Sequence, residues 1–174
     1  MDKMVLRIFQ HEVERQCRFS LLALQDLDQA LQNRDTDRIW YSVQSILVAV
    51  GNISKILWPL KPLLPERGTE LRTSLFVSGD SPLEPRTFRN HFEHFDERLE
   101  EWATSSKRHG FADSNVGPTG MIVGLEPEDF LRNFDSTLFA VTFRGDVYNL
   151  KPIADAVRDL WEKAVVESKK PHRE

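Results

Sequence analysis

The chain has 174 residues, of which 40% are hydrophobic and 29% charged, and its formal net charge is −4. This composition is typical of a soluble globular domain with a core of its own. The negative balance argues against general coating of nucleic acid or of an anionic membrane, while a small basic site on an acidic body stays compatible with it. The lone Cys17 allows no internal disulfide or cysteine-based zinc site, which favours the cytoplasm, and the first residues do not resemble a signal peptide.

Two long helices are predicted in the first third of the chain. Apolar residues recur at helical spacing across residues 4–32. After a turn at 33–37, Thr36 or Asp37 is expected to cap a second helix, which prolines end just beyond Trp58. Residues 39–60 are long enough to cross a bilayer. Because Lys55 would be costly at that depth, a buried central helix is the favoured interpretation.

The rest of the chain predicts two more helices, a small sheet and a final helix. A short helix is expected at 66–78 and a longer one at 83–107, followed by a polar loop at 108–120. Strand-forming residues occupy 121–125, 137–143 and 147–150, and the Arg-Gly-Asp at 144–146 is interpreted as a hairpin turn rather than an adhesion motif. An amphipathic helix is expected at 151–170. The predicted fold is mainly α, an antiparallel helical bundle with a small β-meander inserted before the C-terminal helix.

The helix at 83–107 contains the sequence RTFRNHFEHFDERLEEW at 86–102. On a helical wheel its apolar residues form one stripe, which predicts a core face: Phe88, Phe92, Phe95, Leu99 and Trp102. Asn90 and His94 lie four residues apart on the opposite, polar side. Arg89 and His94 do not point the same way on one helix, so two copies facing each other across a twofold axis would be needed to focus them on one phosphate.

Arg89, Asn90 and His94 carry a resemblance to a known family. An arginine, a polar residue, three further residues and a histidine, placed late in a helical chain of this size, resemble the motif of the HEPN superfamily (higher eukaryotes and prokaryotes nucleotide-binding). The resemblance covers the helical part, about 1–107 and 151–168, in a single domain of residues 1–174. The β insert at 121–150 has no counterpart in the common bundle.

The resemblance implies a homodimer whose motif helices meet at a shared cleft. Many members of the family are metal-independent endoribonucleases that act as toxins or in phage defence, which makes RNA the implied partner, with an antitoxin protein beside it. Others have lost catalysis and bind a nucleotide or a partner protein. Carried over to this chain, Arg89 and His94 are the catalytic pair and Asn90 their polar companion. No cofactor, metal or membrane is implied.

The chemistry of RNA cleavage suits these residue types. Histidine titrates near neutrality and can exchange protons with the 2′-hydroxyl and the leaving oxygen, and arginine offers a planar cationic fork to phosphate oxygens. We therefore expect His94 to be the general acid/base and Arg89 the phosphate clamp. Arg86, His91 and Arg98 are secondary candidates for contacts to the RNA backbone.

Simpler interpretations stand beside this hypothesis. Arg89 is within reach of Glu93 and could form only a surface ion pair, and His91 could be a histidine at the helix edge. The surrounding carboxylates lack the spacing of a strong zinc motif and read as a solvated face, which would repel RNA locally. Cys17 and the four tryptophans are expected to be core residues rather than a nucleophile and a base-stacking platform.

Overall fold

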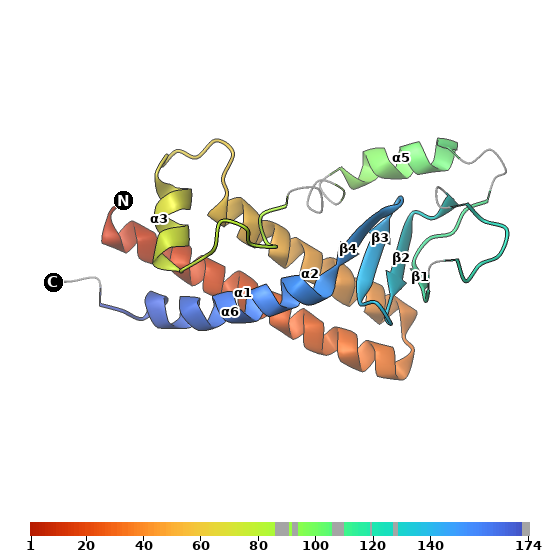
Figure 1. Cartoon of the computed structure of the whole chain (residues 1–174), viewed down its shortest axis with the longest axis horizontal. Helices are drawn as coiled ribbons and strands as arrows, with labels where there is room; N and C mark the ends of the chain where they lie inside the picture. Colours follow the sequence, from red (N-terminus) through yellow and green to blue (C-terminus); the bar gives the residue numbers. More distant parts are fainter. Residues whose placement is uncertain (86–90, 92–93, 106–109, 119, 127–128, 172–174) are drawn as a thin grey trace.

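The computed structural model describes residues 1–85, 91, 94–105, 110–118, 120–126 and 129–171. Three long helices, α1 (Lys3–Asn33), α2 (Thr36–Leu57) and α6 (Leu150–Ser168), lie side by side, with the short α3 (Arg67–Ser74) at the end where both termini lie. A small sheet and α5 (Phe95–Ser105) occupy the other end (Figure 1). The prediction of a mainly helical protein with a small sheet before the last helix is confirmed.

The two predicted long helices form where the periodicity placed them, and their ends follow from local chemistry. The Asp2 carboxylate accepts hydrogen bonds from the Met4 and Val5 amides at the start of α1. Asp35, not the expected Thr36 or Asp37, caps α2 by accepting from the Arg38 amide at 3.0 Å. Because only Arg34 and Asp35 separate the two helices, α1 and α2 run antiparallel in direct contact.

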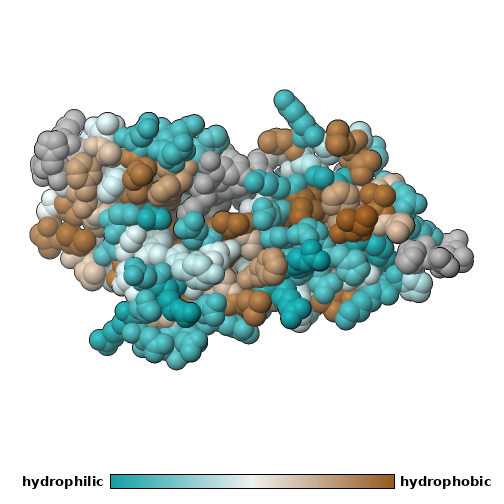
Figure 2. Space-filling model, turned by 180° about the vertical axis from the view of Figure 1, so that it is seen from behind, coloured by the Kyte–Doolittle hydropathy of each residue, from teal (hydrophilic) through white to brown (hydrophobic). Residues whose placement is uncertain are grey.

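The core sits between the long helices and continues under the sheet. Half of the 22 residues of α2 are buried, while Lys55 is exposed, as expected for a central helix with one solvated edge. Trp40, Trp58 and Cys17 are buried in this core, and Phe134 and Val141 of the sheet pack against it. None of the described helices combines the length and the apolar character that a bilayer span requires. Seen from behind, the surface carries small apolar patches among hydrophilic side chains (Figure 2).

The sheet has the strand order β1-β2-β3-β4. β1 (Asn115–Val116) pairs in parallel with β2 (Arg132–Asp135), which pairs antiparallel with β3 (Ala140–Phe143) and through it with β4 (Asp146–Asn149). The predicted hairpin is confirmed: Phe143 pairs with Asp146, and both turn residues, Arg144 (φ 45°) and Gly145 (φ 89°), are left-handed as a two-residue turn demands.

The predictions for three segments in this region are wrong. Residues 121–125 form no strand, since Val123 is almost fully exposed and Gly124 has a φ of 91°. β1 lies inside the segment expected to be a polar loop, and β2 was not expected because its sequence, RNFD, is polar. The buried Asn133 is tolerated in β2 because its amide accepts from the Asn115 side chain and donates to the Gly117 carbonyl.

The helix expected at 83–107 does not begin at residue 83, and the part that forms α5 is not a core helix. Residues 83–85 are turn and coil, and α5 is a helix from Phe95 to Ser105 with no buried residue. It packs beside the sheet rather than between the long helices (Figure 1). The predicted core stripe is therefore wrong for Leu99, which is 41% exposed, while Phe95 and Trp102 are half-buried against the sheet and its loops. Phe88 and Phe92 lie outside the described residues.

Candidate functional site

Three of the six residues that the sequence nominates are described in the structure. His91, His94 and Arg98 lie just before and within α5, close to the tip of the β3–β4 hairpin. Arg86, Arg89 and Asn90 lie outside the described residues, and so does Glu93, the proposed ion-pair partner of Arg89. The described part of the site is therefore a pair of histidines three residues apart with the groups that surround them.

His94 is an exposed histidine at the beginning of α5. Its carbonyl accepts a hydrogen bond from the Arg98 amide at 3.1 Å, so His94 immediately precedes the first turn. The side chain is 53% exposed, and its Nδ1 lies 3.4 Å from a carboxylate oxygen of Glu97, one turn along. The carboxylate lies beside one ring nitrogen and leaves Nε2 to solvent. This arrangement is suited to proton transfer with a ligand in solvent.

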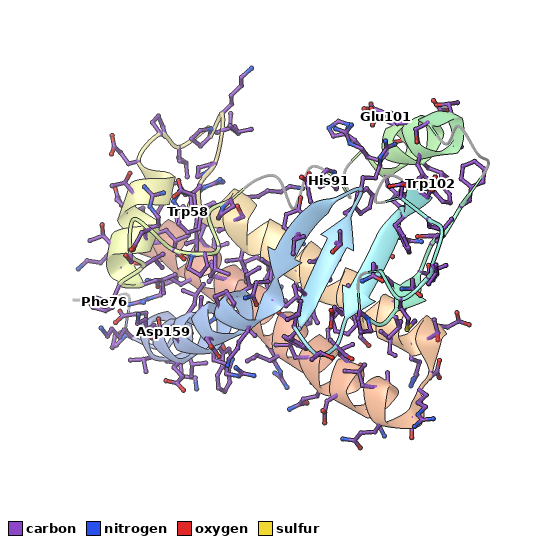
Figure 3. The ribbon with its side chains drawn as sticks, turned by 45° about the vertical axis from the view of Figure 1, so that its right-hand side comes forward. Trp58, Phe76, His91, Glu101, Trp102 and Asp159 are labelled. Carbon is purple, nitrogen blue, oxygen red and sulfur yellow. The ribbon has the colours of Figure 1, made fainter. Side chains whose placement is uncertain are left out.

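His91 has a different environment from His94. Its ring stacks on Phe143 with centroids 4.8 Å apart and an interplanar angle of 18°, and the edge of Tyr148 lies 6.0 Å away. Nε2 is 3.0 Å from a carboxylate oxygen of Asp146, and the side chain is only 13% exposed. Figure 3 places His91 beside the sheet, with Glu101 and Trp102 on the neighbouring α5. His91 therefore connects the motif segment to the β3–β4 hairpin.

Tyr148 does not add a second acid or base to this cluster. Burial, with the nearby negative charge of Asp146, raises the pKa of Tyr148 to about 12. The phenol stays protonated throughout the neutral range, and its ring packs edge-on against His91.

Arg98 is bound by a carboxylate of its own helix. Its guanidinium donates to both oxygens of Glu101, at 2.9 and 2.8 Å. These hydrogen bonds hold the pKa of Glu101 below its ordinary value and raise the pKa of Arg98. Both hydrogen bonds come from Nη1, so an RNA phosphate does not have to displace Glu101, and the contact of Arg98 with the RNA backbone stays a prediction.

Arg132 joins the parts of the molecule that meet beneath the site. Its guanidinium lies over the rings of Trp40 in α2 and Phe95 in α5, at 5.3 and 5.0 Å from their centroids. It also forms a two-pronged ion pair with Asp113, with distances of 2.8 and 2.5 Å. Burial works to raise the pKa of Asp113, but the hydrogen bonds and charge of Arg132, helped by Ser114, hold it below the ordinary value.

Replacing Asp113 by asparagine is expected to lower the stability at neutral pH by about 1–2 kcal/mol. Because the folded state depresses the pKa of Asp113, the ion pair stabilises the fold above the unfolded-state pKa of about 3.9, and this contribution disappears as the pH falls through the folded value. Denaturant unfolding between pH 7 and pH 3 should show the gap between wild type and variant closing at the acid end. Asp155→Asn, which removes an exposed partner of Arg158, is the control. An equal gap at every pH would contradict the assignment.

Sequence reasoning missed the residues that hold the site in place. Phe143, Asp146 and Arg132 contact His91 or Phe95 across a sheet whose pairing had to be known first. In the sequence Asp146 stands out only as part of the turn tripeptide, and its distance along the chain from His91 carries no local signal. Among the described residues, no group of three histidine, cysteine or carboxylate side chains is arranged to hold a metal ion.

Comparisons with known proteins add no assignment to this geometry. No family model, curated protein or solved structure matches the chain.

Proposed function

We propose that this chain is a metal-independent endoribonuclease of HEPN type, which cleaves RNA at a composite site formed by two protomers and serves as a toxin or in phage defence. The proposal rests on the resemblance of Arg89, Asn90 and His94 to the HEPN motif and on the helical character of the chain. The observation that carries it is the environment of His94: an exposed imidazole at the start of a helix, with the Glu97 carboxylate beside its Nδ1.

The chemistry follows from the groups of the substrate and of the motif. One His94 removes the proton from the 2′-hydroxyl, whose oxygen attacks the adjacent phosphorus. The bond from phosphorus to the 5′-oxygen breaks, and that oxygen takes a proton from the His94 of the second protomer, which leaves a 2′,3′-cyclic phosphate and a 5′-hydroxyl. Arg89 would neutralise the charge on the phosphoryl oxygens, and Asn90 would orient the substrate or the histidine. The positive end of the α5 dipole also favours a phosphate near His94.

A second candidate function is a non-catalytic helical module that binds a nucleotide or a partner protein. The first turn of α5 favours it, because Asp96 and Glu97 already complement the dipole and repel a phosphate near His94. In this alternative, Arg89 and His94 hold a ligand or the dimer and no bond is broken.

His94→Ala is expected to reduce cleavage of a mixed RNA pool by about 10²–10⁴-fold, because general acid/base catalysis contributes that much. The assay is run with EDTA, and product ends are tested for the cyclic phosphate. His11→Ala is a closely matched control: His11 is 56% exposed and lies 3.7 Å from Glu14, also three residues along its helix. It should leave both cleavage and folding unchanged.

Two outcomes would count against catalysis. Equal loss in the His11 and His94 variants would indicate a contaminating or non-specific effect of the substitutions. A well-folded wild type that cleaves no RNA, but binds RNA or a nucleotide in a way that His94→Ala weakens, would support the non-catalytic module.

A further inference from the structure

A surface groove between α1 and α2, on residues separate from the candidate site, presents apolar side chains to solvent. Four large residues in it are half or more exposed, Phe19, Leu22 and Val48 at 50% each and Tyr41 at 68%. Polar residues of both helices line the rest of the groove: Gln16, Asp26, Gln44, Ser45 and Asn52. Exposed apolar side chains grouped along two packed helices indicate a surface that another molecule covers.

Exposed and partly buried residues along the two helices form two stripes with the same spacing. On α1 the stripe is Arg15-Phe19-Leu22-Asp26, and on α2 it is Tyr41-Ser45-Val48-Asn52. In each, successive residues are four, three and four positions apart, which keeps all of them within about 60° of one another on the helix. Such a stripe is symmetric about its middle, so it can lie antiparallel against an identical stripe with every position matched.

The charges on α1 suit this antiparallel self-pairing. With the stripes matched, Arg15 of one copy faces Asp26 of the other, and Phe19 faces Leu22. Arg15 is 62% exposed and is held at 2.9 Å by Glu12 of its own helix, so its remaining N–H groups are available to a second carboxylate. Asp26 is exposed and has no ion-pair partner in the described part of the chain. Because Arg15 stands at one end of the stripe and Asp26 at the other, the charges of two antiparallel copies are complementary.

One twofold axis can serve both helices. Asn52 donates a hydrogen bond to Gln16 at 3.2 Å, so these two residues lie at the same level of the antiparallel pair. The middle of the α1 stripe falls between residues 20 and 21, four and a half positions after Gln16. The middle of the α2 stripe falls between residues 46 and 47, five and a half positions before Asn52. The two midpoints therefore differ in level by about one residue, roughly 1.5 Å along the helix.

We propose that the α1–α2 groove is the interface with a second copy of this chain, which docks about a twofold axis perpendicular to the helices. The contact is isologous, with Phe19 and Leu22 at its centre and two Arg15–Asp26 pairs flanking them. At its outer ends this contact also places Arg38 of one copy opposite Lys55 of the other. The two positive charges repel each other, but solvent screens the repulsion. The proposal does not rest on the ribonuclease assignment, since no groove residue belongs to α5 or to the motif.

The test is a charge exchange between two variants, measured by sedimentation equilibrium. Arg15→Glu faces Asp26 with a like charge twice per dimer, and Asp26→Arg faces Arg15 in the same way. Each variant alone should dimerise about tenfold or more weakly than wild type. A one-to-one mixture should form a heterodimer of near wild-type affinity, because every facing pair is then of opposite charge. Arg158→Glu, on an exposed arginine of α6 paired with Asp155 three residues before, is the matched control and should change nothing.

The mass also separates this interface from other assemblies. Wild type should weigh at least twice the 20.2 kDa of one chain. A monomer at every concentration to roughly 100 μM, where interfaces of ordinary size are formed, overturns the proposal. So does a dimer indifferent to both charge reversals, which would point to another contact such as the motif helices. Groove variants that fail only to bind a different protein would assign the groove to that partner instead. Four times the chain mass, reduced to twice by Arg15→Glu, would show this contact together with a second one.

Discussion

Phe143→Ala is expected to lower the free energy of unfolding by about 3–5 kcal/mol, because it removes a fully buried aromatic ring and leaves a cavity. Phe143 is the last residue of β3, and two elements of the site rest on it. The His91 ring stacks on one side, and the Phe95 ring meets it edge-on, with centroids 6.3 Å apart. The substitution should therefore loosen the start of α5 as well as the sheet.

Phe143→Leu separates the contribution of buried apolar surface from that of the aromatic ring stacked on His91. Leucine keeps most of the buried apolar surface but loses the flat ring against His91, so it should cost less than half as much stability. Denaturant unfolding of both variants measures the difference, and the His91 imidazole resonances, followed by NMR, should shift in both. If the leucine variant is as unstable as the alanine variant, the ring geometry matters more than burial. Unshifted His91 resonances would contradict the stacking.

Arg132→Ala is expected to cost about 2–3 kcal/mol, or roughly 4–12 °C in melting temperature. The loss has two parts: Asp113 keeps its charge without its partner, and the packing of the guanidinium between Trp40 and Phe95 disappears. Arg132 pairs across the sheet with Phe143, so both residues act on Phe95. Arg132 therefore links α2, the sheet and α5.

A double-mutant cycle of Arg132→Ala and Asp113→Asn isolates the ion pair. If the pair is direct, the double variant should be about 1 kcal/mol more stable than the sum of the single losses predicts. Thermal melting of the four proteins supplies the numbers, and Arg158→Ala, at an exposed arginine with an ion pair on its own helix, should change little. Strict additivity would show that Asp113 and Arg132 stabilise the fold independently.

The small sheet before the last helix has a structural role in this chain. Its hairpin supplies Phe143 and Asp146 to His91, and β2 supplies Arg132 to Phe95. Trp102 donates to the carbonyl of Asp129, just before the sheet, at 2.9 Å. The insert therefore supports α5 and His91.

The long helices could be predicted from the sequence because their signals are local. Apolar residues at helical spacing mark α1, α2 and α6, and Pro59 follows the end of α2. The Arg144-Gly145 turn could be predicted for the same reason, since a two-residue hairpin demands left-handed backbone. The choice of Asp35 over Thr36 as the cap depends on where the chain leaves α1, within one residue of the prediction.

The strands show where local signals fail. Residues 121–125 have strong strand propensity but form none, whereas RNFD pairs on both sides because Asn133 finds amide and carbonyl partners. Strand propensity describes how well a side chain fits a paired, half-buried surface, and that surface exists only once the chain has folded.

The sequence by itself determined the helical class, the hairpin and the nomination of His91, His94 and Arg98, since each depends on residues a few positions apart. The tertiary structure alone decided that α5 lies beside the sheet and that His91 pairs with Asp146. Contacts such as His91 with Asp146 join residues 55 positions apart. Their energy depends on packing in three dimensions, which no periodicity along the chain records.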